Sequence, residues 1–162
     1  MEIKTFDEAD FAQISEIYKQ GIETGLATFQ DEIPTWNDWD KSHLKTCRLA
    51  MFENGKIVGW VALTPVSSRC VYAGVAEISI YIRNEFRGKG YGKILLGELA
   101  RQSEKEGFWT LQSGIFAENL ASIKLHESCG FRQIGYREKI SKKNGVWKDN
   151  VIMERRSKIV GL

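Results

Sequence analysis

The chain has 162 residues, 43% of them hydrophobic and 27% charged, so it can bury the core of one globular domain and is neither disordered nor fibrous. Its 23 Lys and Arg residues nearly balance its 21 Asp and Glu residues, which argues against nucleic acid or an anionic membrane as partner. Three isolated cysteines, two histidines and no long apolar run argue against a disulfide framework, a metal site and a membrane span, and favour one cytoplasmic domain over residues 1–162.

The first half of the chain is predicted to contain two helices and three strands. In order, they are a strand over 2–6, a helix over 7–21, a loop over 24–30, a helix over 35–47 and strands over 49–53 and 56–64. Asp7 is a plausible N-cap for the first helix, and Thr35 for the second. Asn54-Gly55 between the two later strands is the strongest short signal for a β-hairpin.

The second half is predicted to continue with a β-α-β unit. In order, it contains a loop over 65–72, a strand over 75–83, a helix over 90–107, a strand over 109–116, a helix over 120–129 and strands over 131–140 and 146–154. Hairpins combined with one β-α-β unit imply a mixed sheet with helices on both faces. We therefore expect a single α/β domain that is not doubly wound.

A glycine-rich turn over Glu85–Lys93 separates the strong strand from the helix that follows it. Glycines let backbone N–H groups converge, and a helix N-terminus adds positive potential, so this turn is suited to a pyrophosphate. The turn lacks the spacing of a Walker motif, and no Rossmann pattern surrounds it. Its glycines and basic residues are Gly88, Gly90, Gly92, Arg87, Lys89 and Lys93.

Two motifs resemble those of the GCN5-related N-acetyltransferase (GNAT) superfamily. Arg87-x-x-Gly90-x-Gly92 matches its R/Q-x-x-G-x-G/A motif, and Asn119–Phe131 resembles its N-x-x-[SA]-x-x-L-[YH]-E-x-x-G-F motif. The order of elements agrees along nearly the whole chain, and the resemblance implies acetyl-CoA as co-substrate. The cofactor-binding residues that it implies are Ile80, Tyr81, Ile82, Arg87, Gly88, Lys89, Gly90, Tyr91, Gly92, Lys93 and Asn119.

A narrower resemblance points to the phosphinothricin and methionine sulfoximine acetyltransferases. Ala76–Ile82 is similar to their V-E-x-S-V-Y-V strand, Arg69–Tyr72 to R-x-A-Y, and Asn144–Asp149 to H-G-x-W-x-D with Asn144 in place of His. The chain departs from the family at Pro65-Val66-Ser67, where relatives often read P-F-R, so an arginine near the substrate is missing. Relatives are often dimers, which implies a possible homodimer here.

Glu77 is the candidate catalytic base. Side chains alternate along a strand, so Glu77 shares a face with Ser79 and Tyr81 and stands out in an otherwise apolar run. An apolar setting would suit a general base that takes a proton from the substrate ammonium through water. The alternative is a salt-bridged or edge-exposed glutamate without catalytic role.

The resemblance assigns further roles, each with a structural alternative. Backbone groups of Ile80, Tyr81 and Ile82 would pair with the pantetheine arm, and the Ile82 N–H would polarise the thioester carbonyl. Asn119 would bind the cofactor arm or serve as a helix N-cap. His126 stands where many relatives place a general acid, or is a structural histidine.

The substrate pocket is expected around the loop over 65–72 and Phe29. Arg69 is a candidate for binding a carboxylate or phosphinate, because its planar guanidinium suits such anions, or else it is a surface arginine. Phe29, Val71 and Tyr72 would wall the pocket.

We therefore predict an acetyl-CoA-dependent N-acetyltransferase for a small amino-acid analogue of the phosphinothricin or methionine sulfoximine type. Transfer would occur directly in a ternary complex, since no cysteine occupies a position that suggests an acyl-enzyme. The alternatives are acetylation of a protein or peptide N-terminus, and a non-catalytic CoA-binding regulatory module.

Overall fold

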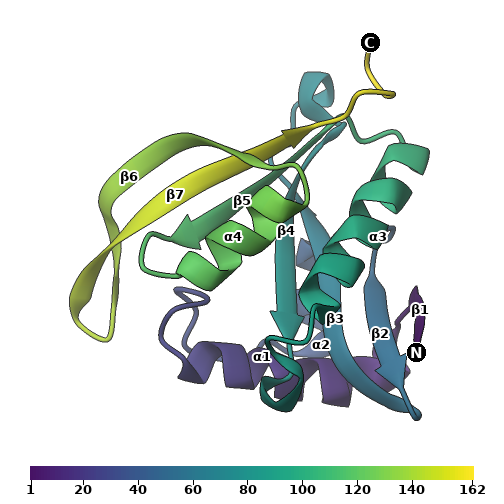
Figure 1. Ribbon diagram of the computed structural model, residues 1–162, viewed down its shortest axis with the longest axis vertical. Helices are drawn as coiled ribbons and strands as arrows, with labels where there is room; N and C mark the ends of the chain where they lie inside the picture. The colour runs from purple at the N-terminus through teal and green to yellow at the C-terminus, as the bar shows by residue number, and fades with distance from the viewer.

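In the computed structural model, which describes residues 1–162, seven strands form one mixed sheet (Figure 1). The strands are β1 (Glu2–Thr5), β2 (Leu49–Glu53), β3 (Lys56–Pro65), β4 (Val75–Ile82), β5 (Thr110–Phe116), β6 (Arg132–Lys143) and β7 (Val146–Arg156). They lie in the order β1-β2-β3-β4-β5-β7-β6, and only β4 and β5 run parallel. The expected mixed α/β sheet is confirmed.

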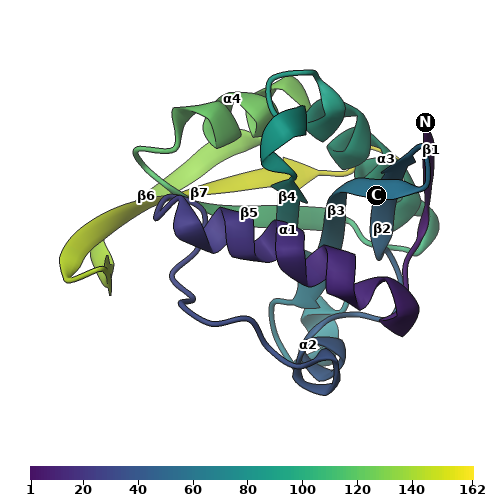
Figure 2. The ribbon, with the colours of Figure 1, turned by 90° about the horizontal axis from the view of Figure 1, so that it is seen from below.

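Helices cover both faces of this sheet, with α1 and α2 on one side and α3 and α4 on the other (Figure 2). The helices are α1 (Phe11–Glu23), α2 (Trp36–Ser42), α3 (Tyr91–Lys105) and α4 (Leu120–Ser128), with 3-10 turns η1 (Glu8–Asp10), η2 (Cys70–Tyr72) and η3 (Asn84–Phe86). Two buried clusters result, one centred on Ile14, Ile17 and Trp39, the other on Leu95 and Leu99. None of the helices combines the length and hydrophobicity needed to cross a membrane.

The second helix is shorter than the predicted range of 35–47. It ends at Ser42, because His43 takes an extended conformation with ψ of 149°. The following residues wrap around the buried guanidinium of Arg48, which donates hydrogen bonds to the carbonyl oxygens of Asp40, His43 and Leu44. A tertiary contact, invisible to local periodicity, therefore ends the helix.

The two central parallel strands pair only at their first residues. Val75–Glu77 of β4 lie beside Thr110–Gln112 of β5, and no pairing follows. Beyond this point β4 stays paired with β3 as far as Ile82, and β5 stays paired with β7 as far as Phe116. The strands must therefore diverge, and the sheet opens at its centre.

Candidate active site

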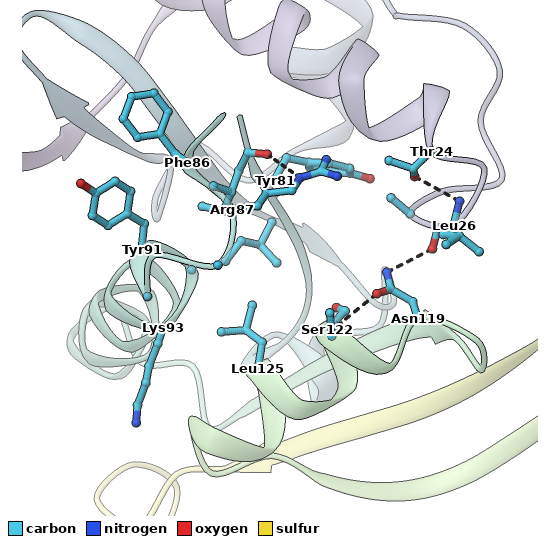
Figure 3. A pocket seen from close by; sticks show the side chains of 17 residues that line it. Thr24, Leu26, Tyr81, Phe86, Arg87, Tyr91, Lys93, Asn119, Ser122 and Leu125 are labelled. Atoms are coloured by element: carbon cyan, nitrogen blue, oxygen red, sulfur yellow. Dashed lines mark hydrogen bonds between the residues drawn. The ribbon is translucent and has the colours of Figure 1, made fainter. Parts of the chain in front are cut away.

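A cavity of about 430 Å³ lies between the N-termini of α3 and α4 and the free edge of β4 (Figure 3). All the predicted cofactor-binding residues except Lys89 line it, namely Ile80, Tyr81, Ile82, Arg87, Gly88, Gly90, Tyr91, Gly92, Lys93 and Asn119. Lys89 lies outside, with Nζ 4.8 Å from the centre of the Phe86 ring. The structure thus brings together residues that span forty positions of the sequence.

The turn before α3 requires glycine for its backbone conformation. Gly88 and Gly90 have φ of 74° and 83°, in the left-handed region, while no atom lies within 4 Å of a Cβ placed on either residue. Gly90 is the N-cap of α3 and offers no side chain to the first N–H groups of the helix. Gly88 and Gly90 line this end of the cavity together with Arg87 and Lys93, and the free N–H groups of a helix N-terminus attract anions, so this end is a candidate anion site.

Two residues of β4 offer backbone groups to the opening. The Arg83 N–H donates to the Val58 carbonyl of β3 at 2.9 Å, so odd-numbered residues of β4 direct their peptide groups toward β3. Ile80 and Ile82 therefore direct theirs toward the gap. The expectation for Tyr81 is wrong as far as its backbone is concerned, because its peptide groups face β3 and its side chain lines the cavity.

Asn119 uses both ends of its amide within the protein. Its Oδ1 accepts a hydrogen bond from the Ser122 N–H, which confirms the N-cap alternative, and its Nδ2 donates to the Leu26 carbonyl oxygen, both at 3.2 Å. Figure 3 shows this bridge between α4 and the loop after α1. A direct role of Asn119 in cofactor binding stays a prediction.

The loop after α1 is held from its other end by Lys143. This lysine is 3% exposed, and its Nζ donates to the Gln30 carbonyl oxygen and to Asp31 Oδ1, both at 2.6 Å. The sequence predicted that the first strand of this hairpin ends at residue 140, whereas β6 runs on to Lys143 and only Asn144 and Gly145 form the turn. The loop after α1, which lines the site, is therefore hydrogen-bonded to the β6–β7 hairpin.

Two further cavities adjoin the first. One of about 300 Å³ lies between β4 and β5, and one of about 690 Å³ lies on the face of α1 and α2. The first and second share residues from the loop, β4 and α4: Leu26, Ala27, Ile80, Tyr81, Asn119 and Ser122. The second and third share Thr28, Gln30, Glu77, Ser79 and Tyr81. The three cavities therefore lie next to one another, from the candidate anion site through the gap to the opposite face.

Glu77 lies where the second and third cavities meet. The alternation along β4 is confirmed, because Glu77, Ser79 and Tyr81 all line the cavity on the α1 side. The expected apolar setting is wrong, since Glu77 is exposed through the gap between the strands. Its Oε2 accepts a hydrogen bond of 3.0 Å from Gln112 Nε2, and it has no salt bridge.

His126 is buried beneath the second cavity with 1% of its surface exposed. Its Nδ1 lies 2.8 Å from the Ser122 carbonyl oxygen, which can only accept, so Nδ1 carries the proton. Its Nε2 is buried and has no hydrogen-bond partner. Burial lowers the pKa of His126, so the ring is neutral near pH 7 and offers a lone pair at Nε2.

The predicted substrate residues separate into two groups. Phe29 lines the second cavity, with its ring centre 4.4 Å from that of Phe116. Arg69, Val71 and Tyr72 lie in and beside η2, line none of the three cavities and are exposed to solvent. Arg69 packs on its neighbour, with Cζ 5.5 Å from the centre of the Tyr72 ring.

Among the polar residues of the second cavity that sequence reasoning missed are Gln112, Arg137 and Asn150. They lie on β5, β6 and β7, at positions with no motif of their own. Only the pairing of the strands brings them beside Glu77. The signal that would reveal them is the strand order, in which β7 inserts between β5 and β6.

Comparison with known proteins gives three kinds of match. The model of the acetyltransferase (GNAT) family matches residues 11–131. An L-methionine sulfoximine/L-methionine sulfone acetyltransferase of Salmonella typhimurium is 31% identical over 159 residues, which are 95% of this chain and 93% of that protein. A phosphinothricin acetyltransferase from Sinorhizobium meliloti, solved in complex with AcCoA, has a TM-score of 0.89 at 28% identity and covers 99% of this chain and 90% of its own. A ribosomal-protein-alanine N-acetyltransferase from Brucella melitensis also has a TM-score of 0.89 at 28% identity, covering 97% of this chain and 100% of its own.

Proposed function

The chain belongs to the acetyltransferase (GNAT) family and is an acetyl-CoA-dependent N-acetyltransferase, and we propose that its acceptor is a small amino-acid analogue of the phosphinothricin or methionine sulfoximine type. We further propose that the acetyl group passes directly to the amine while both substrates are bound. The observation that carries the proposal is that the cavity at Gly90 and the cavity at Glu77 are direct neighbours, with six lining residues in common.

The cofactor end of this space fits acetyl-CoA, which supplies the acetyl group as a thioester. The α3 N-terminus, Arg87 and Lys93 match the negative charge of a pyrophosphate. The peptide groups of Ile80 and Ile82 face the gap and suit an extended amide chain added to the edge of β4. The Ile82 N–H would then polarise the thioester carbonyl.

The acceptor end supports proton removal from an amine. We assign Glu77 the role of base, acting through water on the ammonium, because its carboxylate is exposed at the meeting point of two cavities. The ammonium loses one proton to Glu77 and becomes a neutral amine; as its nitrogen bonds to the acetyl carbon and the C–S bond breaks, the nitrogen loses a second proton and the sulfur gains one. His126 is neutral with a free Nε2, so it can take up that proton and pass it on, but it cannot donate one before it has received one.

Direct transfer is supported by the positions of the cysteines. Cys47 is buried in the core, Cys70 belongs to η2 and Cys129 follows α4, and none of them lines any of the three cavities. A covalent acyl-enzyme would need such a nucleophile beside the thioester.

A second candidate function is acetylation of a peptide N-terminus. The likeness to a ribosomal-protein-alanine N-acetyltransferase favours it, as does the third cavity of about 690 Å³, which is open to the face of α1 and α2. A non-catalytic CoA-binding module is disfavoured, since the exposed Glu77 lines the second cavity, which neighbours the cofactor cavity.

A thiol-release assay with acetyl-CoA tests the proposal. The acceptors are phosphinothricin, methionine sulfoximine, methionine sulfone and an alanine-initiated peptide, with a reaction lacking acceptor as control. We expect turnover with the amino-acid analogues in excess of the control. Turnover with the peptide alone would assign the second function, and tight CoA binding without any turnover would assign the module.

We also propose a homodimer formed through the β6–β7 hairpin. The hairpin extends away from the body of the domain (Figures 1 and 2). It carries exposed large hydrophobic side chains, namely Ile134, Tyr136, Ile140, Val146 and Trp147. Such a concentration of apolar side chains on an edge strand is typical of an interface.

A further inference from the structure

One arginine lines the space in which the acceptor would bind. The second and third cavities are lined by three carboxylates, Glu77, Glu32 and Asp38, and by Arg137 as their only lysine or arginine. A small amino acid carries both a cationic amine and an anionic group. Arg137 is therefore the one side chain in these two cavities with the fixed positive charge to bind the anion.

Strand pairing sets the direction of the Arg137 side chain. Arg137 lies opposite Asn150 of β7, which lies opposite Phe116 of β5. Val151, next to Asn150, is buried in the core beneath α3, so Asn150 points to the other face of the sheet. Arg137 shares that face with Asn150 and with Glu77.

The guanidinium is free to bind a ligand. Arg137 makes no ion pair and no side-chain hydrogen bond, whereas Arg132 of the same strand is paired with Glu154 at 3.2 Å. Gly114 keeps this region open, because a Cβ there would lie 3.1 Å from Asn150 Nδ2. The face between Glu77 and Arg137 thus has room for a small molecule.

The same cavity holds unpartnered polar atoms. Three buried side-chain polar atoms in the protein lack a hydrogen-bond partner, and two of them, His126 Nε2 and Asn150 Oδ1, belong to residues that line this cavity. Buried polar atoms are nearly always satisfied, so their presence here indicates a polar ligand. Both atoms accept hydrogen bonds, which suits the N–H groups of a substrate, whereas Arg137 only donates, which suits an oxyanion.

We propose that Arg137 binds the acidic group of the acceptor, a carboxylate or phosphinate oxyanion, and thereby determines which amines are acetylated. Glu77 and Arg137 lie on β4 and β6 with two strands between them, so they hold opposite ends of the substrate. This inference rests on the proposed acetylation of an amino-acid analogue. Arg137 thereby takes the role that the sequence had suggested for Arg69, which lies outside the cavities.

Steady-state kinetics of Arg137→Gln test the proposal. We expect its KM for phosphinothricin and for methionine sulfone to rise by about 10-fold to 100-fold, the range for losing a charge-assisted hydrogen bond. The KM for acetyl-CoA should stay unchanged, and Arg137→Lys should recover part of the loss, because lysine keeps the charge without the planar fork. Arg132→Gln is the matched control on the same strand, and circular dichroism checks that each variant folds.

The α-carboxamides of both acceptors identify the anion. If the effect of Arg137→Gln vanishes with both carboxamides, Arg137 binds the α-carboxylate; if it persists for the carboxamide of phosphinothricin, Arg137 binds the phosphinate. An unchanged KM for every acceptor in Arg137→Gln would overturn the proposal, as would a rise confined to Arg69→Gln. Absence of acetylation by the wild-type protein would instead reject the proposed function itself.

Discussion

At the scale of single residues, the proposed chemistry depends on one carboxylate. Glu77 is exposed and its Oε2 accepts a hydrogen bond from Gln112, so Glu77→Gln keeps the shape of the side chain and removes its negative charge and its basicity. We expect kcat to fall by about 10²-fold to 10⁴-fold, the usual contribution of a general base, with little change in the KM for acetyl-CoA. The thiol-release assay measures both constants. Glu154→Gln, on β7 outside all three cavities, is the control, and an equal loss in both variants would refute the role of Glu77.

His126 and His43 link stability to pH at the same scale. Burial lowers the pKa of both histidines in the folded protein, and the Arg48 charge lowers that of His43 further. In the unfolded chain they titrate near pH 6.5. Below that pH the unfolded state therefore binds more protons than the folded state does. Their contribution to stability is therefore complete above about pH 6.5 and is lost as the pH falls through the folded pKa.

Thermal unfolding between pH 7 and pH 5 tests this linkage. We expect Tm to fall as the pH is lowered, and to fall less steeply in His126→Gln and in His43→Gln. The slopes are compared rather than the absolute values, because His126→Gln also changes the hydrogen bond to Ser122. Parallel curves for the wild type and both variants would show that neither histidine carries the effect.

At the scale of an element, α3 has glycines with opposite roles. Gly90 has φ of 83°, so Gly90→Ala places a Cβ in the left-handed region and costs about 1–2 kcal/mol of stability. Gly97 is exposed in the helix interior with no atom within 4 Å of a Cβ, so Gly97→Ala stabilises by about 0.8–1 kcal/mol. Urea unfolding measures both changes, and titration with acetyl-CoA should show weaker binding for Gly90→Ala alone. Stability changes of the same sign would contradict this account of the turn.

Local patterns predicted most elements and the glycine-rich turn before α3, because both depend on neighbours in the sequence. The Asn54-Gly55 hairpin and the glycines before α3 report backbone conformation directly. The end of α2 was not predicted, because it depends on hydrogen bonds from Arg48. Only folding brings Arg48 to the end of this helix. Arg137 was not predicted as a site residue for the same reason, since its position beside the site follows from the insertion of β7 between β5 and β6.

At the scale of the whole molecule, one departure from regular pairing creates the site. The sheet is continuous except where β4 and β5 diverge, and the resulting gap is lined by residues of α4 and of the loop after α1. The cofactor cavity approaches the gap from the side of α3 and α4, and the third cavity approaches it from the side of α1 and α2. This arrangement fits the proposed ternary complex, in which the two substrates would enter from opposite faces of the sheet.

The proposed homodimer is the last prediction at this scale. The β6 edge ends the sheet, and the hydrophobic side chains of the hairpin are 44–57% exposed, an arrangement that a second copy would cover. We expect light scattering after size-exclusion chromatography to give twice the monomer mass for the wild type. The double variant Ile140→Asp with Val146→Asp should give the monomer mass, since it places charge within the interface.

Ile159→Asp is the control for this experiment, because Ile159 is an equally apolar, 70% exposed residue near the C-terminus and outside the hairpin. A dimer also makes Tm rise with protein concentration, because association stabilises the folded state by mass action. This dependence should be present in the wild type and in Ile159→Asp, and absent in the double variant. A wild-type protein that is monomeric with a constant Tm would show that the hairpin does not pair with a second copy.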